Sequence, residues 1–160
     1  MKHLAIILVL ALLAGVVAVG WVYLNARVTI EAVGVIATEA ASQLNLFDSL
    51  QSQQAEGALV GTNFTTEPLG EASDYQFYSY TVRLKNNCFI PADMVELTVT
   101  PMSGDVLQMG DPTPKVLQAR TTGDITATIL TKVGMHATRE LNVTWYMWGI
   151  PFSIKTAYGK

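Results

Sequence analysis

The sequence predicts a mainly β protein, in which an N-terminal transmembrane helix precedes an antiparallel β-sandwich with one short amphipathic helix. Three features indicate this: an unbroken apolar run near the N-terminus, several short segments of alternating apolar and polar residues, and turn residues between those segments. Alternation with a two-residue period is typical of strands with one buried face. Strands that follow one another without intervening helices favour a sandwich. We expect an anchor at residues 1–26 and one sandwich domain at residues 27–160.

The apolar run covers residues 4–24 and reads LAIILVLALLAGVVAVGWVYL. A helix of this length spans roughly 30 Å, which is the thickness of the hydrocarbon core of a bilayer. Trp21 and Tyr23 lie at its outer end, and amphipathic rings favour the membrane–water interface. The sequence therefore predicts the lipid bilayer as a partner, with Trp21 and Tyr23 as membrane-interface residues.

The same run has a second interpretation. The small residues AVG at 18–20 fit the cleavage site of a secretory signal peptide. The run continues to Leu24, however, and exceeds the usual signal core of about 7–15 residues, which favours an uncleaved signal-anchor. Lys2 and the α-amino group outweigh Arg27 beyond the run, in agreement with a cytoplasmic N-terminus. We expect a single-pass protein of the cell membrane with its C-terminal domain outside the cytoplasm.

The pattern beyond the anchor changes twice. Residues 27–33 alternate as in a strand, whereas residues 38–54 place apolar side chains at helical spacing, and residues 55–74 show no period and predict a long loop. Further along, five segments each place their apolar residues on one face: 76–85, 93–100, 125–129, 141–147 and 150–154. Turn residues separate them at 86–87, 101–105, 110–112, 123–124 and 134.

One stretch resembles a known family. Residues 80–101, YTVRLKNNCFIPADMVELTVTP, resemble the strand–turn–strand of immunoglobulin-like accessory domains on membrane-anchored bacterial surface proteins. The resemblance covers 22 of 160 residues and implies an immunoglobulin-like sandwich but no activity. An apolar helix before a β domain is also similar to pilin-like subunits, although the Gly-plus-Glu processing signature of bacterial pilins is missing here.

Residues capable of catalysis are few. The histidines are His3, at the membrane edge, and His136, in an expected turn, and the single cysteine is Cys88. A nucleophile needs a neighbouring base, and a metal site needs clustered ligands, and the spacing of these residues predicts neither. We expect no catalytic residue, no cofactor and no metal site.

The cluster WYMW at residues 145–148 is the most suggestive candidate for binding. In a strand, Trp145 and Met147 point to one face, and Tyr146 and Trp148 to the other. We assign the first pair to the core. Tyr146 and Trp148 then form either a second packed face or an exposed face for a partner or ligand.

The net charge of −3 argues against a nucleic-acid partner, which requires a basic surface. Residues 28–82 carry seven acids and no Lys or Arg, whereas residues 83–160 have a net charge of +2. The two parts either pack together and partly cancel their fields or attract neighbouring copies. The sequence thus favours a membrane-anchored extracytoplasmic binding or assembly module, with a protein partner or self-association and without catalytic activity. The alternative is a pilin-like subunit of an extracellular filament or envelope complex, assembled through the N-terminal helix.

Overall fold

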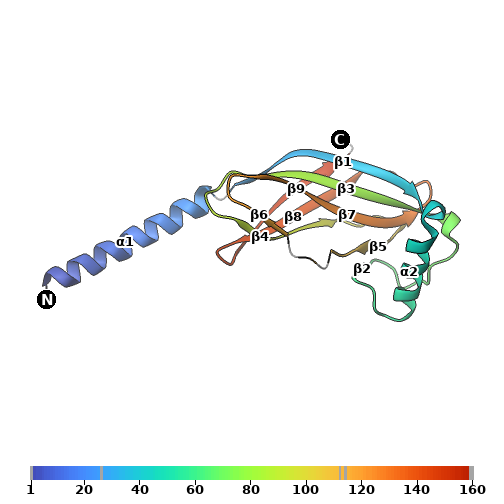
Figure 1. Ribbon diagram of the computed structural model, residues 1–160, viewed down its shortest axis with the longest axis horizontal. Helices are drawn as coiled ribbons and strands as arrows, with labels where there is room; N and C mark the ends of the chain where they lie inside the picture. Colours follow the sequence, from blue (N-terminus) through green and yellow to red (C-terminus); the bar gives the residue numbers. More distant parts are fainter. Residues whose placement is uncertain (1, 26, 112, 114, 159–160) are drawn as a thin grey trace.

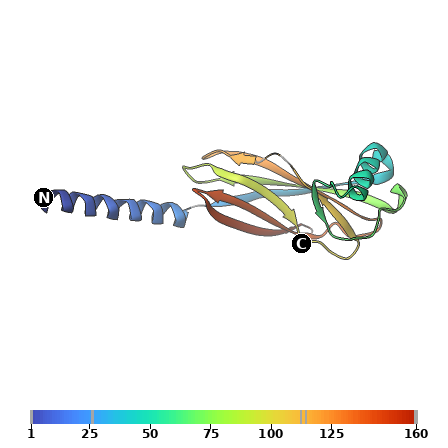
Figure 2. The ribbon, with the colours of Figure 1, turned by 90° about the horizontal axis from the view of Figure 1, so that it is seen from below.

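The apolar N-terminal run forms one helix, α1 (Lys2–Asn25), in the computed structural model, which describes residues 2–25, 27–111, 113 and 115–158. Figures 1 and 2 show α1 as a rod that projects from one end of the β-structure. Its window His3–Trp21 is 0% buried, and it is long and apolar enough to cross a membrane. The expected boundary between anchor and domain falls at residue 26, which lies outside the described residues.

The remainder is a sandwich of two antiparallel sheets, as predicted. One sheet has the order β1-β3-β7-β5-β2 and the other β6-β4-β8-β9. The strands are β1 (Val28–Glu39), β2 (Gly61–Asn63), β3 (Tyr75–Asn86), β4 (Ala92–Val99), β5 (Asp105–Met109), β6 (Lys115–Leu117), β7 (Thr122–Lys132), β8 (Arg139–Met147) and β9 (Ile150–Tyr158).

The main core lies between the sheets and is built from the alternating faces that the sequence predicts. Burial of every second side chain removes apolar surface from water, and this is the main source of stability for such strands. Tyr80, Val82, Ile129, Leu141 and Val143 are each 0% exposed.

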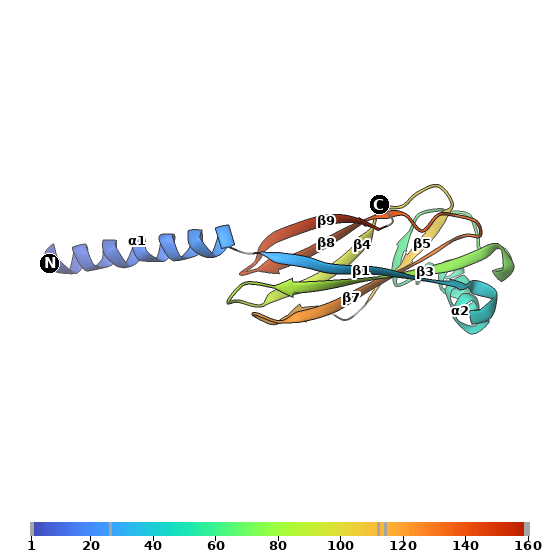
Figure 3. The same ribbon diagram turned by 90° about the horizontal axis from the view of Figure 1, so that it is seen from above.

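A second, smaller core lies at the end opposite α1. It is covered by α2 (Leu44–Ala55), which follows the 3-10 turn η1 (Ala40–Gln43), and Figure 3 shows α2 at this distal end. Phe47 of α2 packs against Tyr75, with 5.6 Å between ring centroids. Phe77 of β3 also belongs to this cluster, so β3 is buried on both faces near its start.

Several boundaries differ from the sequence prediction. The helix predicted over residues 38–54 begins only at Leu44, because β1 continues to Glu39 and pairs with β3 along its whole length. The expected loop 55–74 contains β2 and the 3-10 turn η2 (Ala72–Asp74). The expected turn at 101–105 ends where β5 begins, and residues 123–124 lie within β7, opposite Leu84 and Arg83. In each case pairing with a distant strand outweighs the local preference.

Candidate functional site

Three connections meet at the end of the sandwich that carries α1. They are residues 87–91 between β3 and β4, residues 118–121 between β6 and β7, and residues 148–149 between β8 and β9, and we call them the anchor-end loops. Figures 1, 2 and 3 all show the tips of these connections beside the last turn of α1.

Two aromatic contacts join α1 to the sandwich. Trp21 stacks on Phe89 of the first loop, with 6.1 Å between ring centroids. Tyr23 contacts Phe152 of β9, with 5.6 Å between centroids, and Phe152 in turn stacks on Trp145. The two side chains that the sequence assigns to the membrane interface therefore also contact the domain, Trp21 through the β3–β4 loop and Tyr23 through β9.

Asn86 explains why the loops adopt this arrangement. Its side-chain amide is buried, donates hydrogen bonds to the carbonyl oxygens of Ile90, Leu117 and Gln118, and accepts one from the N–H of Cys88. A buried amide with several partners holds its surroundings in one arrangement. Asn86 thus fixes the first two anchor-end loops relative to each other.

The first two anchor-end loops, together with Trp21 of α1 and Arg27, line a pocket of about 400 Å³ that combines aromatic rings with two arginines. The guanidinium of Arg120 lies 4.0 Å from the centre of the Phe89 ring, a cation–π arrangement. Arg27 lines the other side, and its carbonyl oxygen accepts a hydrogen bond from the N–H of Asn87. Among the described residues no carboxylate forms an ion pair with either arginine. Unpaired guanidinium groups beside exposed rings form a site suited to an anionic group.

In the aromatic cluster at 145–148, Trp145 and Met147 face the core, as the sequence predicts. Trp145 and Met147 are 3% and 2% exposed. Tyr146 is partly exposed and borders a shallow groove with Met94. Trp148 is 59% exposed and lies in the β8–β9 turn with a φ of 51°, so it belongs to the anchor-end loops rather than to the outer face of β8. Whether either residue binds a partner stays a prediction.

The distal end contains a buried pair of opposite charges. Arg139 of β8 donates two hydrogen bonds to the carboxylate of Asp105 in β5, at 2.7 and 2.9 Å, and both side chains are buried. Hydrogen bonding to Asp105 raises the pKa of Arg139 above its ordinary value. Tyr80 donates its hydroxyl hydrogen to the carbonyl oxygen of Ala137, and burial, only partly offset by the charge of Arg139, raises its pKa to about 12. This network orders the loops between the sheets.

A hollow of about 530 Å³ lies beside this network and is lined by residues 64–65, 67–68 and 101–106 together with Tyr75 and Lys132. Within the described part of the chain, no group of three His, Cys, Asp or Glu side chains could hold a metal ion. Cys88 is buried at the opposite end.

The sequence analysis did not predict the pocket that Arg27 and Arg120 line. Asn86 and Asn87 are visible only as turn residues, and Arg27, Phe89 and Arg120 are isolated in sequence. Their proximity depends on the pairing of β3 with β7 and of β4 with β6, which no local pattern encodes.

Comparison with known proteins gives little further information. No protein-family model matches the chain, and no curated protein matches it. Among solved structures, the chain is similar to the crystal structure of the cupredoxin domain of amoB from Nitrosocaldus yellowstonii. The identity is 14% and the TM-score 0.33, over 81% of this chain and 84% of that one. This distant likeness assigns no function.

Proposed function

We propose that this protein is a membrane-anchored binding or assembly module without catalytic activity, in which α1 crosses the bilayer and holds the sandwich outside the cytoplasm. The observation that carries the proposal is the fully exposed apolar surface of α1. Its 24 residues form a rod of about 36 Å, enough for a hydrocarbon core of about 30 Å. A helix that is apolar on every side needs an apolar environment.

Membrane extraction tests this proposal. Full-length protein should resist alkaline extraction from membranes, its intact mass should include α1, and protease added outside intact cells should reach the sandwich. The double variant Leu12→Arg/Val16→Arg should release the protein, because each arginine at the helix centre costs about 2.5–3.5 kcal/mol on insertion scales. The matched variant Leu12→Phe/Val16→Phe should stay in the membrane. A mature chain that begins near Trp21 would refute the anchor.

We place the sandwich among the immunoglobulin-like accessory domains, because residues 80–101 resemble them and form the end of β3, the connection to the facing sheet, and β4. The family implies no particular partner. The question of what the module binds therefore depends on its surfaces.

The edge strand β1 favours self-association as the assembly mode. It is 12 residues long and pairs only with β3 among the described strands, so its outer side lacks a strand partner. Residues 32–38 of this edge carry no charged side chain and no proline, and Ile36 is 68% exposed. A long apolar edge strand that lacks charged residues and proline readily pairs with a further strand. This edge also suits the second candidate function, a subunit of a filament or envelope complex.

Cross-linking in native membranes tests the edge. Wild-type protein should form oligomers, and Ile36→Lys should abolish them, because a charge on the edge opposes strand addition. The matched variant Val133→Lys places the same charge on an equally apolar, exposed residue in the β7–β8 turn and should leave the oligomers intact. If all three proteins are monomeric, the assembly proposal fails while the anchor stands.

A further inference from the structure

We propose that the anchor-end loops form a lipid-binding surface, in which Phe89 and Trp148 enter the membrane interface and Arg27 and Arg120 bind the phosphate groups of lipids around α1. This inference rests on the proposed membrane crossing of α1 and adds a second, peripheral contact between the sandwich and the same bilayer.

The depth of the loops follows from the Trp21–Phe89 contact. Trp21 lies four residues before the end of α1, which is about 6 Å along the axis, and Phe89 reaches back to stack on it. The polar interface on each side of a bilayer is about 5–8 Å thick. A helix that places Trp21 at this interface therefore places Phe89 there too. Phe89 is 67% exposed, as a side chain that contacts lipid should be.

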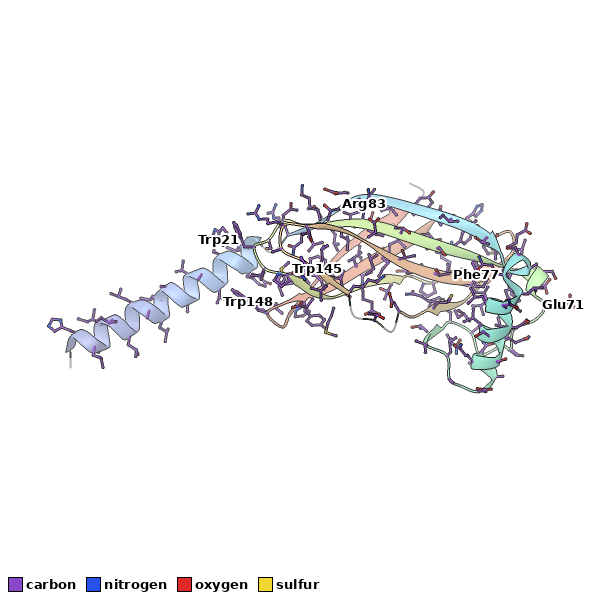
Figure 4. The ribbon with its side chains drawn as sticks, viewed as in Figure 1. Trp21, Glu71, Phe77, Arg83, Trp145 and Trp148 are labelled. Atoms are coloured by element: carbon purple, nitrogen blue, oxygen red, sulfur yellow. The ribbon has the colours of Figure 1, made fainter. Side chains whose placement is uncertain are left out.

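The hairpin β8–β9 is held at the same level. Phe152 contacts Tyr23 of α1, and Trp148 lies in the turn that precedes it in this hairpin. Figure 4 shows Trp148 and Trp21 at the same end of the molecule, with Glu71 at the opposite end. The two contacts, one with the β3–β4 loop and one with β9, fix the orientation of the sandwich relative to α1, so the loops face the bilayer in a defined orientation.

Backbone strain gives an independent indication. Among the described residues, the non-glycine residues with positive φ are Met94, Arg120 and Trp148, at 50°, 60° and 51°. All three are exposed; Arg120 and Trp148 lie in the anchor-end loops, and Met94 lies at an irregularity of β4, three residues beyond the first loop. Such conformations are costly for residues with a side chain, and they concentrate at functional sites. Here they direct an apolar, a cationic and an aromatic side chain outward.

The charges complete the match to a membrane surface. Arg27 and Arg120 line the pocket beside α1 without a carboxylate partner among the described residues, and guanidinium groups bind phosphate in a bidentate manner. Six exposed acids lie instead toward the distal end, Glu39, Asp48, Glu56, Glu67, Glu71 and Asp74, whereas one exposed acid, Asp93, lies at the start of β4 beside the first loop. This polarity attracts the loop end to an anionic bilayer and keeps the acidic end away from it.

Quenching of tryptophan fluorescence by brominated lipids tests the aromatic contact. Three full-length proteins are compared in nanodiscs of brominated phospholipid: wild type, Trp148→Phe, and Trp148→Phe/Val133→Trp, which moves the reporter to the distal end. The quenched fraction should be largest in the wild type, and the tryptophan at 133 should add only unquenched emission.

Trp21 supplies the internal control in all three proteins. If it is quenched but wild-type Trp148 is quenched no more than the tryptophan at 133, the lipid surface is refuted and the anchor stands. If no tryptophan is quenched, the membrane crossing of α1 fails, and this inference fails with it.

A charge-matched pair of variants tests the phosphate contact. Arg27→Gln/Arg120→Gln should reduce the quenching of Trp148 severalfold in nanodiscs that contain anionic lipid. Lys132→Gln/Lys155→Gln removes the same charge away from the loops and should leave the quenching unchanged. Equal quenching in both variants would overturn the role of the arginines.

Discussion

Trp145 and Trp148 lie three residues apart and occupy opposite environments. Trp145 is 3% exposed and stacks on Phe152, whereas Trp148 is 59% exposed in a turn. We predict that Trp145→Ala lowers the free energy of unfolding by about 3–5 kcal/mol, because it leaves a cavity in the core. Trp148→Ala should change it by no more than about 0.5 kcal/mol. Denaturant melts of the two variants measure the difference.

A milder variant separates cavity formation from loss of the indole. The indole N–H of Trp145 is buried without a hydrogen-bond partner among the described residues. Trp145→Phe keeps a ring against Phe152 and removes this unpaired donor, so it should cost less than Trp145→Ala. A large loss for Trp148→Ala as well would mean that its side chain is packed, and would contradict its assignment to a lipid or partner surface.

Tyr80 predicts a stability change at high pH. Burial raises its pKa to about 12 from 10.0, whereas the unfolded chain ionises near the ordinary value. Folding therefore favours the protonated form. The contribution of Tyr80 is fully present below about pH 10 and is lost as the pH rises toward about 12. Tyr80→Phe should cost about 1 kcal/mol at neutral pH through the lost hydrogen bond to Ala137.

The test compares wild-type and Tyr80→Phe melts from about pH 8 to about pH 12. The wild type should lose more stability than the variant over this range, since the charges and tyrosines that face Tyr80, which are Arg139, Asp105, Tyr78 and Tyr158, are common to both proteins. Parallel curves would show that Tyr80 ionises normally in the folded protein.

The pocket lined by Arg27 and Arg120 shows which site residues a local sequence pattern does not predict. Trp21 and Tyr23 can be assigned to an interface from their place at the end of an apolar run. Phe89 and Arg120 cannot be assigned to it in this way. Their place near the interface depends on the stacking of Phe89 on Trp21 of α1, on the cation–π contact between Arg120 and Phe89, and on the positive φ of Arg120. The sequence signal was limited to the turn residues Asn86 and Asn87.

At the scale of elements, the pair Asp105–Arg139 joins β5 of one sheet to β8 of the other. Both side chains are buried, at 0% and 1% exposure. We predict that Arg139→Met lowers the free energy of unfolding by about 3–5 kcal/mol, because it leaves the buried carboxylate of Asp105 unpaired. The double variant Asp105→Leu/Arg139→Met should lose less than the sum of the single losses. A double-mutant cycle of denaturant melts measures the coupling.

The exposed pair Arg83–Asp124 provides the matched control. It has similar bidentate geometry, at 2.8 and 2.9 Å, on the surface of β3 and β7. Because both side chains are solvated, Arg83→Met should cost little and couple weakly with Asp124→Leu. If the losses in the free energy of unfolding at Asp105 and Arg139 were additive, the ion pair would not stabilise the packing of the two sheets.

The elements also show where local pattern and tertiary pairing agree. The five alternating segments beyond residue 75 all became strands, because their apolar faces close one common core. Helical spacing placed α2 but not its start, since residues 38–39 pair with β3 at Phe77 and Gln76. The short strands β2 and β6 have three residues each, too few to show a period, and exist through their partners β5 and β4.

For the whole molecule, the two oppositely charged parts do not neutralise each other by contact. They pack in one sandwich, as β1 and β3 share a sheet with β7, but among the described residues Glu31–Lys85 at 3.8 Å is the one ion pair that joins them. The other six acids of residues 28–82 lie toward the distal end, and Arg27 and Arg120, which pair with no carboxylate among the described residues, lie next to α1. The asymmetry of the sequence thus becomes a polarity along the long axis.

The separation of α1 from the two cores leads to the prediction that residues 27–160 fold without α1. Among the described side chains, neither hydrophobic core contains a residue of α1, and the ring contacts of α1 with the sandwich are Trp21–Phe89 and Tyr23–Phe152, which involve half-exposed side chains. The fragment should therefore unfold cooperatively, with a free energy of unfolding within about 1 kcal/mol of the full-length protein, since losses at solvated contacts are small.

Circular dichroism and denaturant melts of the fragment, compared with full-length protein in mild detergent, measure both properties. The spectrum should be dominated by strand signal with a minor helical part from α2, because the strands β1 to β9 of the described residues lie in this region. A spectrum more than half helical would rule the sandwich out. A melt without a cooperative transition would show that α1 is part of the folding unit. The aromatic contacts at the anchor end would then be needed to form the core, and the loops would not be free to bind lipid.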